Sequence, residues 1–218
     1  MVRLCCLFVL SALSYFCDVS GTVLEYERTY VDSGKLKWKH VMEIGESRAE
    51  DDALTLDYSS TFRGPSGSVM YGGPVALVAK LHEGGDVEMD LSCSLASVFT
   101  NYVGEKAVSF EPCFSLLPAD MEPGERLEDA HFEVTVLGLK YKVSVTEREV
   151  LRRESIKTAA GDFDCVVVRE HKVEKGPGRN RETTALTWYA KGVGMVRHDT
   201  YDRKGVLETS EVLVSMKR

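Results

Sequence analysis

The feature that most constrains this chain is a strict alternation of residues between Leu36 and Ile44. The positions on one side of this alternation are Leu36, Trp38, His40, Met42 and Ile44, and the residues between them are mostly polar. Successive side chains of a strand point to opposite faces of its sheet, so this period of two predicts a half-buried β-strand.

Similar runs recur along the chain and are separated by short turns. Asp32-Ser33-Gly34-Lys35 precedes the strand at Leu36, and Tyr201–Leu207 repeats the same turn pattern near the C terminus. Glycine in such turns adopts backbone angles that other residues avoid, which favours hairpins. The spacing predicts about twelve strands in an all-β fold, a curved antiparallel sheet or half-barrel.

Two segments depart from this rhythm. Leu91, Leu95, Val98, Phe99 and Tyr102 follow a helical period, with Asp90 as the expected N-cap and Gly104 as the expected end. This amphipathic helix is expected to pack on the sheet, and the open alternative is a lid over an apolar cavity. Residues 112–129 lack alternation and are expected to form an irregular crossing loop.

The N terminus has the pattern of a secretory signal peptide. Arg3 is followed by an apolar run over residues 4–16, which is shorter than the roughly 20 residues that a membrane-spanning helix needs. The small residues that end at Gly21 predict cleavage after that position, and the alternative is a buried N-terminal helix. The expected organisation is therefore a signal peptide, residues 1–21, and one β domain, residues 22–218.

The predicted signal peptide limits where the protein can be located, but it leaves open how the protein is anchored and how its cysteines pair. It predicts a periplasmic or outer-membrane-associated protein, and lipidation of Cys17 is the alternative that would add an anchor. Cys93, Cys113 and Cys165 follow the predicted cut, and an odd number leaves their pairing open. The formal net charge of −7 argues against a nucleic-acid partner.

Motifs that carry chemistry are missing from the sequence. It contains no GxSxG, P-loop or GxGxxG pattern and no histidine pair at metal-ligand spacing, so no catalytic residue, metal or cofactor is predicted and the protein is not expected to be an enzyme. His40 is expected to be hydrogen-bonded in the core, whereas His171 and His198 are expected to be solvated. Gly192 and Gly194 are expected to let two strands bend or pass closely.

The two tryptophans are the strongest candidates for a binding site. Trp38 and Trp188 each share a strand face with apolar residues, so both are predicted to line an apolar pocket inside the curved sheet. Phe99 joins them as a candidate ligand contact from the helix. The ordinary alternative for all three side chains is core packing.

The C-terminal third also carries a family resemblance. Its motifs are Ala160-Gly161-Asp162-Phe163-Asp164-Cys165, Trp188-Tyr189-Ala190-Lys191-Gly192-Val193-Gly194-Met195-Val196-Arg197 and the turn Tyr201–Leu207. They resemble a family of secreted Bacteroidetes-type proteins of unknown function, sometimes labelled TapB-like. The resemblance implies a curved half-barrel similar to the lipoprotein carriers of the periplasm, and it supplies no catalytic residues.

Two functions follow as expectations. The first is a non-enzymatic protein that binds an apolar ligand or a lipidated partner in the concave face of its sheet. The alternative is a structural or assembly protein of the cell envelope that binds other proteins through exposed sheet edges. A hydrolase without a recognisable motif is the least favoured reading.

Overall fold

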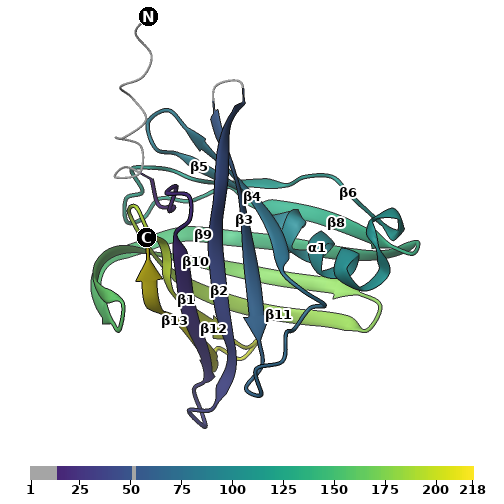
Figure 1. Cartoon of the computed structure of the whole chain (residues 1–218). Helices are drawn as coiled ribbons and strands as arrows, with labels where there is room; N and C mark the ends of the chain where they lie inside the picture. Colours follow the sequence, from purple (N-terminus) through teal and green to yellow (C-terminus); the bar gives the residue numbers. More distant parts are fainter. Residues whose placement is uncertain (1–13, 51–52) are drawn as a thin grey trace, which may run out of the picture.

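The structure is a computed structural model that describes residues 14–50 and 53–218. Within these residues the chain forms one antiparallel sheet of thirteen strands and one α-helix (Figure 1). The strands are β1 (Val23–Tyr30), β2 (Leu36–Glu50), β3 (Ala53–Arg63), β4 (Val75–His82), β5 (Val87–Asp90), β6 (Val108–Phe110), β7 (Phe114–Leu117), β8 (Ala130–Val136), β9 (Leu139–Thr158), β10 (Gly161–Gly176), β11 (Arg179–Ala190), β12 (Gly194–Tyr201) and β13 (Leu207–Lys217). The expected all-β fold is confirmed.

The strand order places the first and last strands side by side in the middle of a long, curved sheet. It runs β6-β8-β9-β10-β11-β12-β13-β1-β2-β3-β4-β5-β7, so β1 and β13 are neighbours in its middle. A long antiparallel sheet twists and curls, and here the curl brings its two ends toward the same side (Figure 1). The strand β7 lies in residues 112–129, where a loop was expected, because pairing with β5 extends a segment that has no alternation of its own.

The helix α1 (Leu91–Val103) lies between the two ends of the sheet. It contacts β4 and β7 from one end and β6 and β8 from the other. As expected, the Asp90 side chain accepts hydrogen bonds from the first turn, and Gly104 ends the helix with a φ of 83°. Ala96 packs against Val134 and Val136, with Phe99 beside them. The helix is therefore part of the core.

The concave face of the sheet holds the main core. The alternation predicted for β2 is confirmed, since His40 and Ile44 are buried while Lys39 and Glu43, each directly before one of them, are exposed. The largest fully buried side chains include Tyr26, Leu24, Leu56, Leu81, Leu117, Met121 and Leu213. Burying aromatic and aliphatic groups of this size is the main source of stability for such a domain.

Gly45 lies where β2 and β3 pack too closely for a side chain, and a substitution can test this close packing. It lies at a β-bulge in β2, and a Cβ atom at this position would sit 2.4 Å from the backbone oxygen of Asp57. We expect Gly45→Ala to lower the free energy of unfolding by about 1–3 kcal/mol, measured by urea denaturation, because backbone must shift. Gly64→Ala is the matched control, since its Cβ would meet the Ser68 hydroxyl at 3.4 Å. An equal loss in both variants would contradict this reading.

Candidate functional site

The concave interior has two zones along the strand direction. Near the turn between β11 and β12, the inward-facing side chains are mainly apolar, and we call this zone the apolar end. It includes Leu24, Tyr26, Ile44, Tyr58 and Leu213. Near the turns that join β1 to β2 and β12 to β13, the inward-facing side chains are mostly polar. The two zones meet where Tyr26 stacks on His40, with ring centroids 5.0 Å apart.

The polar zone is organised by strand register. Thr187, His198, Glu211, Arg28 and Trp38 lie directly opposite one another on five neighbouring strands, from β11 to β2. Opposed residues share a face, so all five side chains point into the interior. We call this set the polar row. It joins residues from both ends of the chain, and no local motif marks it.

Glu211 is the centre of the polar row. Its carboxylate accepts hydrogen bonds from Arg28 at 3.2 Å and from His40 Nδ1 at 2.8 Å, and the Trp38 indole lies 3.5 Å from it. The Arg28 guanidinium also donates to Thr209 and Thr200 and lies 4.9 Å from the centre of the Trp38 ring. A buried charge pair is tolerated in this way only when its remaining donors and acceptors are also satisfied.

His40 links Glu211 to Ser60. Its second ring nitrogen, Nε2, lies 2.9 Å from the Ser60 hydroxyl, so the three residues have the connectivity of a Ser–His–acid catalytic triad. Ser60 is only 2% exposed, and the rings of Tyr26 and Phe62 stack on the imidazole. A substrate carbonyl would have to reach this hydroxyl, so the closed arrangement is better explained as a structural hydrogen-bonded chain.

The polar row shifts the pKa values of two of its members. Burial opposes ionisation of Glu211, but its hydrogen bond to His40 and the charges of His40 and Arg28 outweigh burial and lower its pKa to about 2. Burial and the nearby Arg28 charge lower the pKa of His198 to about 4. His198 is half-buried and shares a hydrogen bond of 2.9 Å with Thr187, so the expectation that it is solvated is wrong.

The apolar end contains a segment of the predicted signal peptide. Tyr15, Phe16 and Cys17 are all buried there. The Phe16 ring meets the Tyr58 ring edge-on, with centroids 5.1 Å apart. A Cβ atom on Gly194 would lie 3.6 to 4.0 Å from the backbone of these three residues. These are ordinary van der Waals distances, so a Cβ would fit there, and it is the positive φ of 92° that favours glycine at this position.

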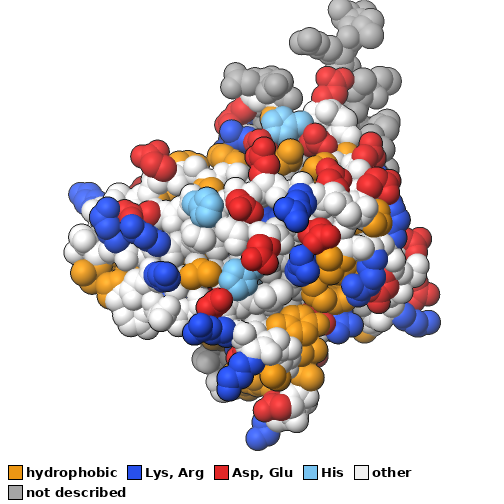
Figure 2. Space-filling view, turned by 180° about the vertical axis from the view of Figure 1, so that it is seen from behind, with side chains coloured by type: hydrophobic (Ala, Val, Ile, Leu, Met, Phe, Trp, Pro, Cys, Tyr) orange, Lys and Arg blue, Asp and Glu red, His pale blue; other side chains and the backbone are white. Residues whose placement is uncertain are grey.

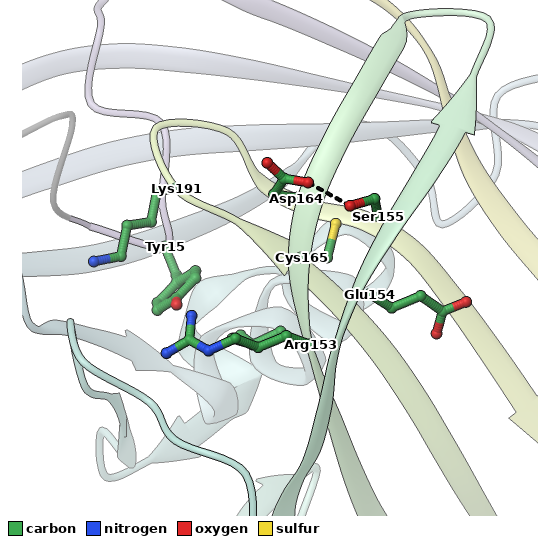
Figure 3. A pocket seen from close by; sticks show the side chains of 8 residues that line it. Tyr15, Arg153, Glu154, Ser155, Asp164, Cys165 and Lys191 are labelled. Atoms are coloured by element: carbon green, nitrogen blue, oxygen red, sulfur yellow. Dashed lines mark hydrogen bonds between the residues drawn. The ribbon is translucent and has the colours of Figure 1, made fainter.

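A pocket of about 420 Å³ adjoins this segment (Figure 3). Arg153 and Lys191 reach toward Tyr15 from different elements, one from β9 and one from the turn after β11. The Lys191 ammonium lies 5.5 Å from the centre of the Tyr15 ring. Asp164 and Cys165 line the far side of the pocket, where Asp164 accepts a hydrogen bond from Ser155. The mouth of the apolar end is therefore polar and carries cations.

The structure separates the three predicted ligand contacts. Trp38 faces the interior but lies in the polar row rather than in an apolar wall. Trp188 follows Thr187 in β11 and so lies on the opposite face of this strand, where the Arg197 guanidinium lies 4.7 Å from its ring centre and its indole N–H donates to Glu154. Its side chain is only 3% exposed and packs in the main core, as the core-packing alternative expects. Phe99 packs against Tyr141 in the helix–sheet contact. The two tryptophans therefore lie on opposite faces of the sheet, and their role in ligand binding stays a prediction.

The described residues have free cysteines, no cluster suited to a metal ion and a surface of mixed charge. Cys17, Cys93, Cys113 and Cys165 are all free thiols. Residues 14–50 and 53–218 contain no cluster of side chains suited to a metal ion. None of the helices in this part of the chain has the length and apolar character needed to cross a membrane. Acidic and basic side chains are interspersed over the face shown in Figure 2.

Comparisons with known proteins identify a matching family model and solved structures with a similar fold. A family model described as DUF3108-like matches residues 19–213. A protein from Bacteroides fragilis, described as exported and as having a YmcC-like fold, superimposes with a TM-score of 0.75 at 20% identity, over 94% of this chain and all of its own. A protein from Parabacteroides distasonis, described as a lipoprotein, gives 0.76 at 21% identity, over 94% and 99% of the two chains. None of the curated proteins compared matches.

Proposed function

Because this chain belongs to the DUF3108-like family, and shares its fold with proteins described as exported or as lipoproteins, we propose that it is an exported, envelope-associated binding protein without enzymatic activity. Its ligand is apolar and occupies the apolar end of the interior. The TapB-like label remains a prediction, since the family is established only as one of unknown function.

The observation that carries this proposal is the place of residues 14–17. These residues lie before the predicted cut after Gly21, yet Tyr15, Phe16 and Cys17 fill part of the apolar end. Cleavage at that position would remove them and leave a space bordered by Tyr58 and Gly194. An apolar space of this kind favours an apolar ligand, because water there finds few hydrogen-bonding partners.

The first test is the mass of the exported chain. We expect native mass spectrometry of protein purified from its own envelope to show loss of residues 1–21 and the added mass of an apolar molecule that organic extraction releases. A chain that retains residues 14–17 would contradict the proposal, because the space would then be occupied by its own N terminus.

A second test measures binding directly. After extraction, the processed chain is expected to raise the fluorescence of the neutral probe N-phenyl-1-naphthylamine, since the probe fluoresces in apolar surroundings. The matched control is a chain that begins at residue 14, in which Phe16 blocks the space and the signal should be lost. Equal signals from the two chains would place the probe elsewhere and would overturn this site.

A second candidate function, an assembly protein of the envelope, has one observation in its favour. The strand β6 is an edge of the sheet, and the neighbouring turn between β8 and β9 exposes Leu137 and Leu139. Exposed apolar residues beside a free strand edge are typical of protein-binding surfaces. If Leu137→Glu abolishes crosslinks to other envelope proteins while probe binding persists, this function is favoured.

A further inference from the structure

We propose that the ligand is a single-chain amphiphile whose anionic head group, a carboxylate or a phosphate, binds between Arg153 and Lys191 at the mouth of the apolar end. This inference rests on the proposed function, because it specifies the chemistry of the same ligand. The juxtaposition that carries it is a polar pocket with two cations (Figure 3), which also borders Cys165 and Val166 of the main apolar core.

The groups that surround the N-terminal segment are hydrogen-bond donors or cations. The Gly192 backbone N–H donates to the Ser14 carbonyl at 2.8 Å, and Arg153 lies beside Tyr15 while its guanidinium donates to the Met121 carbonyl at 3.2 Å and to Glu122. Lys191 lies over the Tyr15 ring. All three groups are donors or cations, and none can accept a hydrogen bond. Removal of residues 14–21 leaves these groups facing a vacant space, which an acceptor-rich head group would satisfy.

The two cations of the pocket also have acidic neighbours. Arg153 pairs with Glu122 at 2.7 Å and Lys191 with Asp120 at 3.6 Å, but these carboxylates are 68% and 95% exposed. Exposed ion pairs contribute little free energy, so the two cations remain available to a ligand that reaches them from a less hydrated side. Two acids line the pocket itself: Glu154 is held by Arg152 and Trp188, and Asp164 accepts a hydrogen bond from Ser155 on the far side.

The pocket places its cations next to apolar side chains, which restricts the shape of the ligand. The pocket that contains Arg153 and Lys191 also contains Cys165 and Val166, whose side chains belong to the main apolar core. A molecule with one charged end and one apolar chain would therefore place its head at the two cations and its chain in the space left by Phe16 and Cys17. An uncharged chain gains only the apolar contact.

The test uses the processed chain purified from the envelope and freed of lipid. Dissociation constants of dodecanoate, dodecyl phosphate, dodecanol and dodecyltrimethylammonium are measured by displacement of N-phenyl-1-naphthylamine. We expect one or both anions to bind about tenfold more tightly than the alcohol, since charge-assisted hydrogen bonds are worth roughly 1.5–3 kcal/mol. The cation should bind most weakly. Comparing the two anions tells whether the head group is a carboxylate or a phosphate.

Charge reversal at the mouth supplies the decisive variant. Lys191→Glu should weaken binding of the preferred anion about tenfold and leave dodecanol unchanged. Lys157→Glu is the matched control, because it makes the same charge change at a residue that is 84% exposed and outside the pocket. Arg153→Gln should act in the same direction as Lys191→Glu.

The possible failures are distinguishable. If the probe binds but the anions and dodecanol compete equally, or if Lys191→Glu has no more effect than Lys157→Glu, the head-group site is refuted and the apolar site stands. If the probe does not bind the processed chain at all, the proposed function itself fails.

Discussion

Replacing Glu211 with alanine should lower the free energy of unfolding by about 3–5 kcal/mol. The carboxylate holds Arg28 at 3.2 Å and His40 at 2.8 Å in the interior, and it is itself only 4% exposed. Its removal leaves a buried guanidinium without its counter-charge, and desolvating an unpaired charge is costly. Urea denaturation followed by circular dichroism measures the change.

A neighbouring carboxylate provides the control for this prediction. Glu208 lies on the same strand and pairs with Arg181 at 2.9 Å, but its side chain is 41% exposed. Glu208→Ala should cost less than about 1 kcal/mol. Glu211→Gln, which keeps the shape of the side chain, measures the loss of charge alone if the alanine variant does not fold. Similar losses in Glu208→Ala and Glu211→Ala would show that the polar row has no special role in stability.

Acidification should destabilise the protein in two steps. His198 has its pKa lowered to about 4, so between pH 6.5 and 4 the unfolded chain binds a proton that the folded protein does not. Stability contributed by the neutral imidazole is therefore lost as the pH falls through this window, by about 2–3 kcal/mol. Glu211, with a pKa of about 2, adds a second loss between pH 4.5 and 2.

The first step can be assigned with a pair of variants. In His198→Gln, the free energy of unfolding should change much less between pH 6.5 and 4 than in the parent protein. His131→Gln replaces an exposed histidine on β8 and should leave the pH dependence unaltered. A parent protein whose stability is constant over this window would contradict the lowered pKa of His198.

The parts of the fold that the sequence predicts are those fixed by neighbours along the chain. The helix cap at Asp90 and the turn before Leu36 depend on a few adjacent residues, and both form as expected. Alternation also identifies which residues share a strand face. It does not say which face is concave, and for this reason the sequence could not show that Trp38 and Trp188 lie on opposite faces of the sheet.

The site was less predictable because it depends on register between distant strands. Arg28 and Glu211 oppose each other across 183 positions of sequence, and local patterns contain no information about such pairs. One signal was available, since Arg28 continues the inward series of Leu24 and Tyr26, where a charge is unusual and requires a partner. The packing of Phe16 could not be distinguished from a signal peptide in the sequence, because an apolar signal peptide and a buried N-terminal segment give the same pattern.

The pairing of β1 with β13 also governs when the protein can fold. These strands stand side by side in the middle of the sheet, so their contact must close a loop that spans nearly the whole chain. Such long-range pairing is slow, because the entropy of closure is lost before the contacts form. A chain that emerges from its N terminus cannot assemble the polar row until its last strand has arrived. The fold is therefore completed late, once β13 is available to pair with β1 and β12.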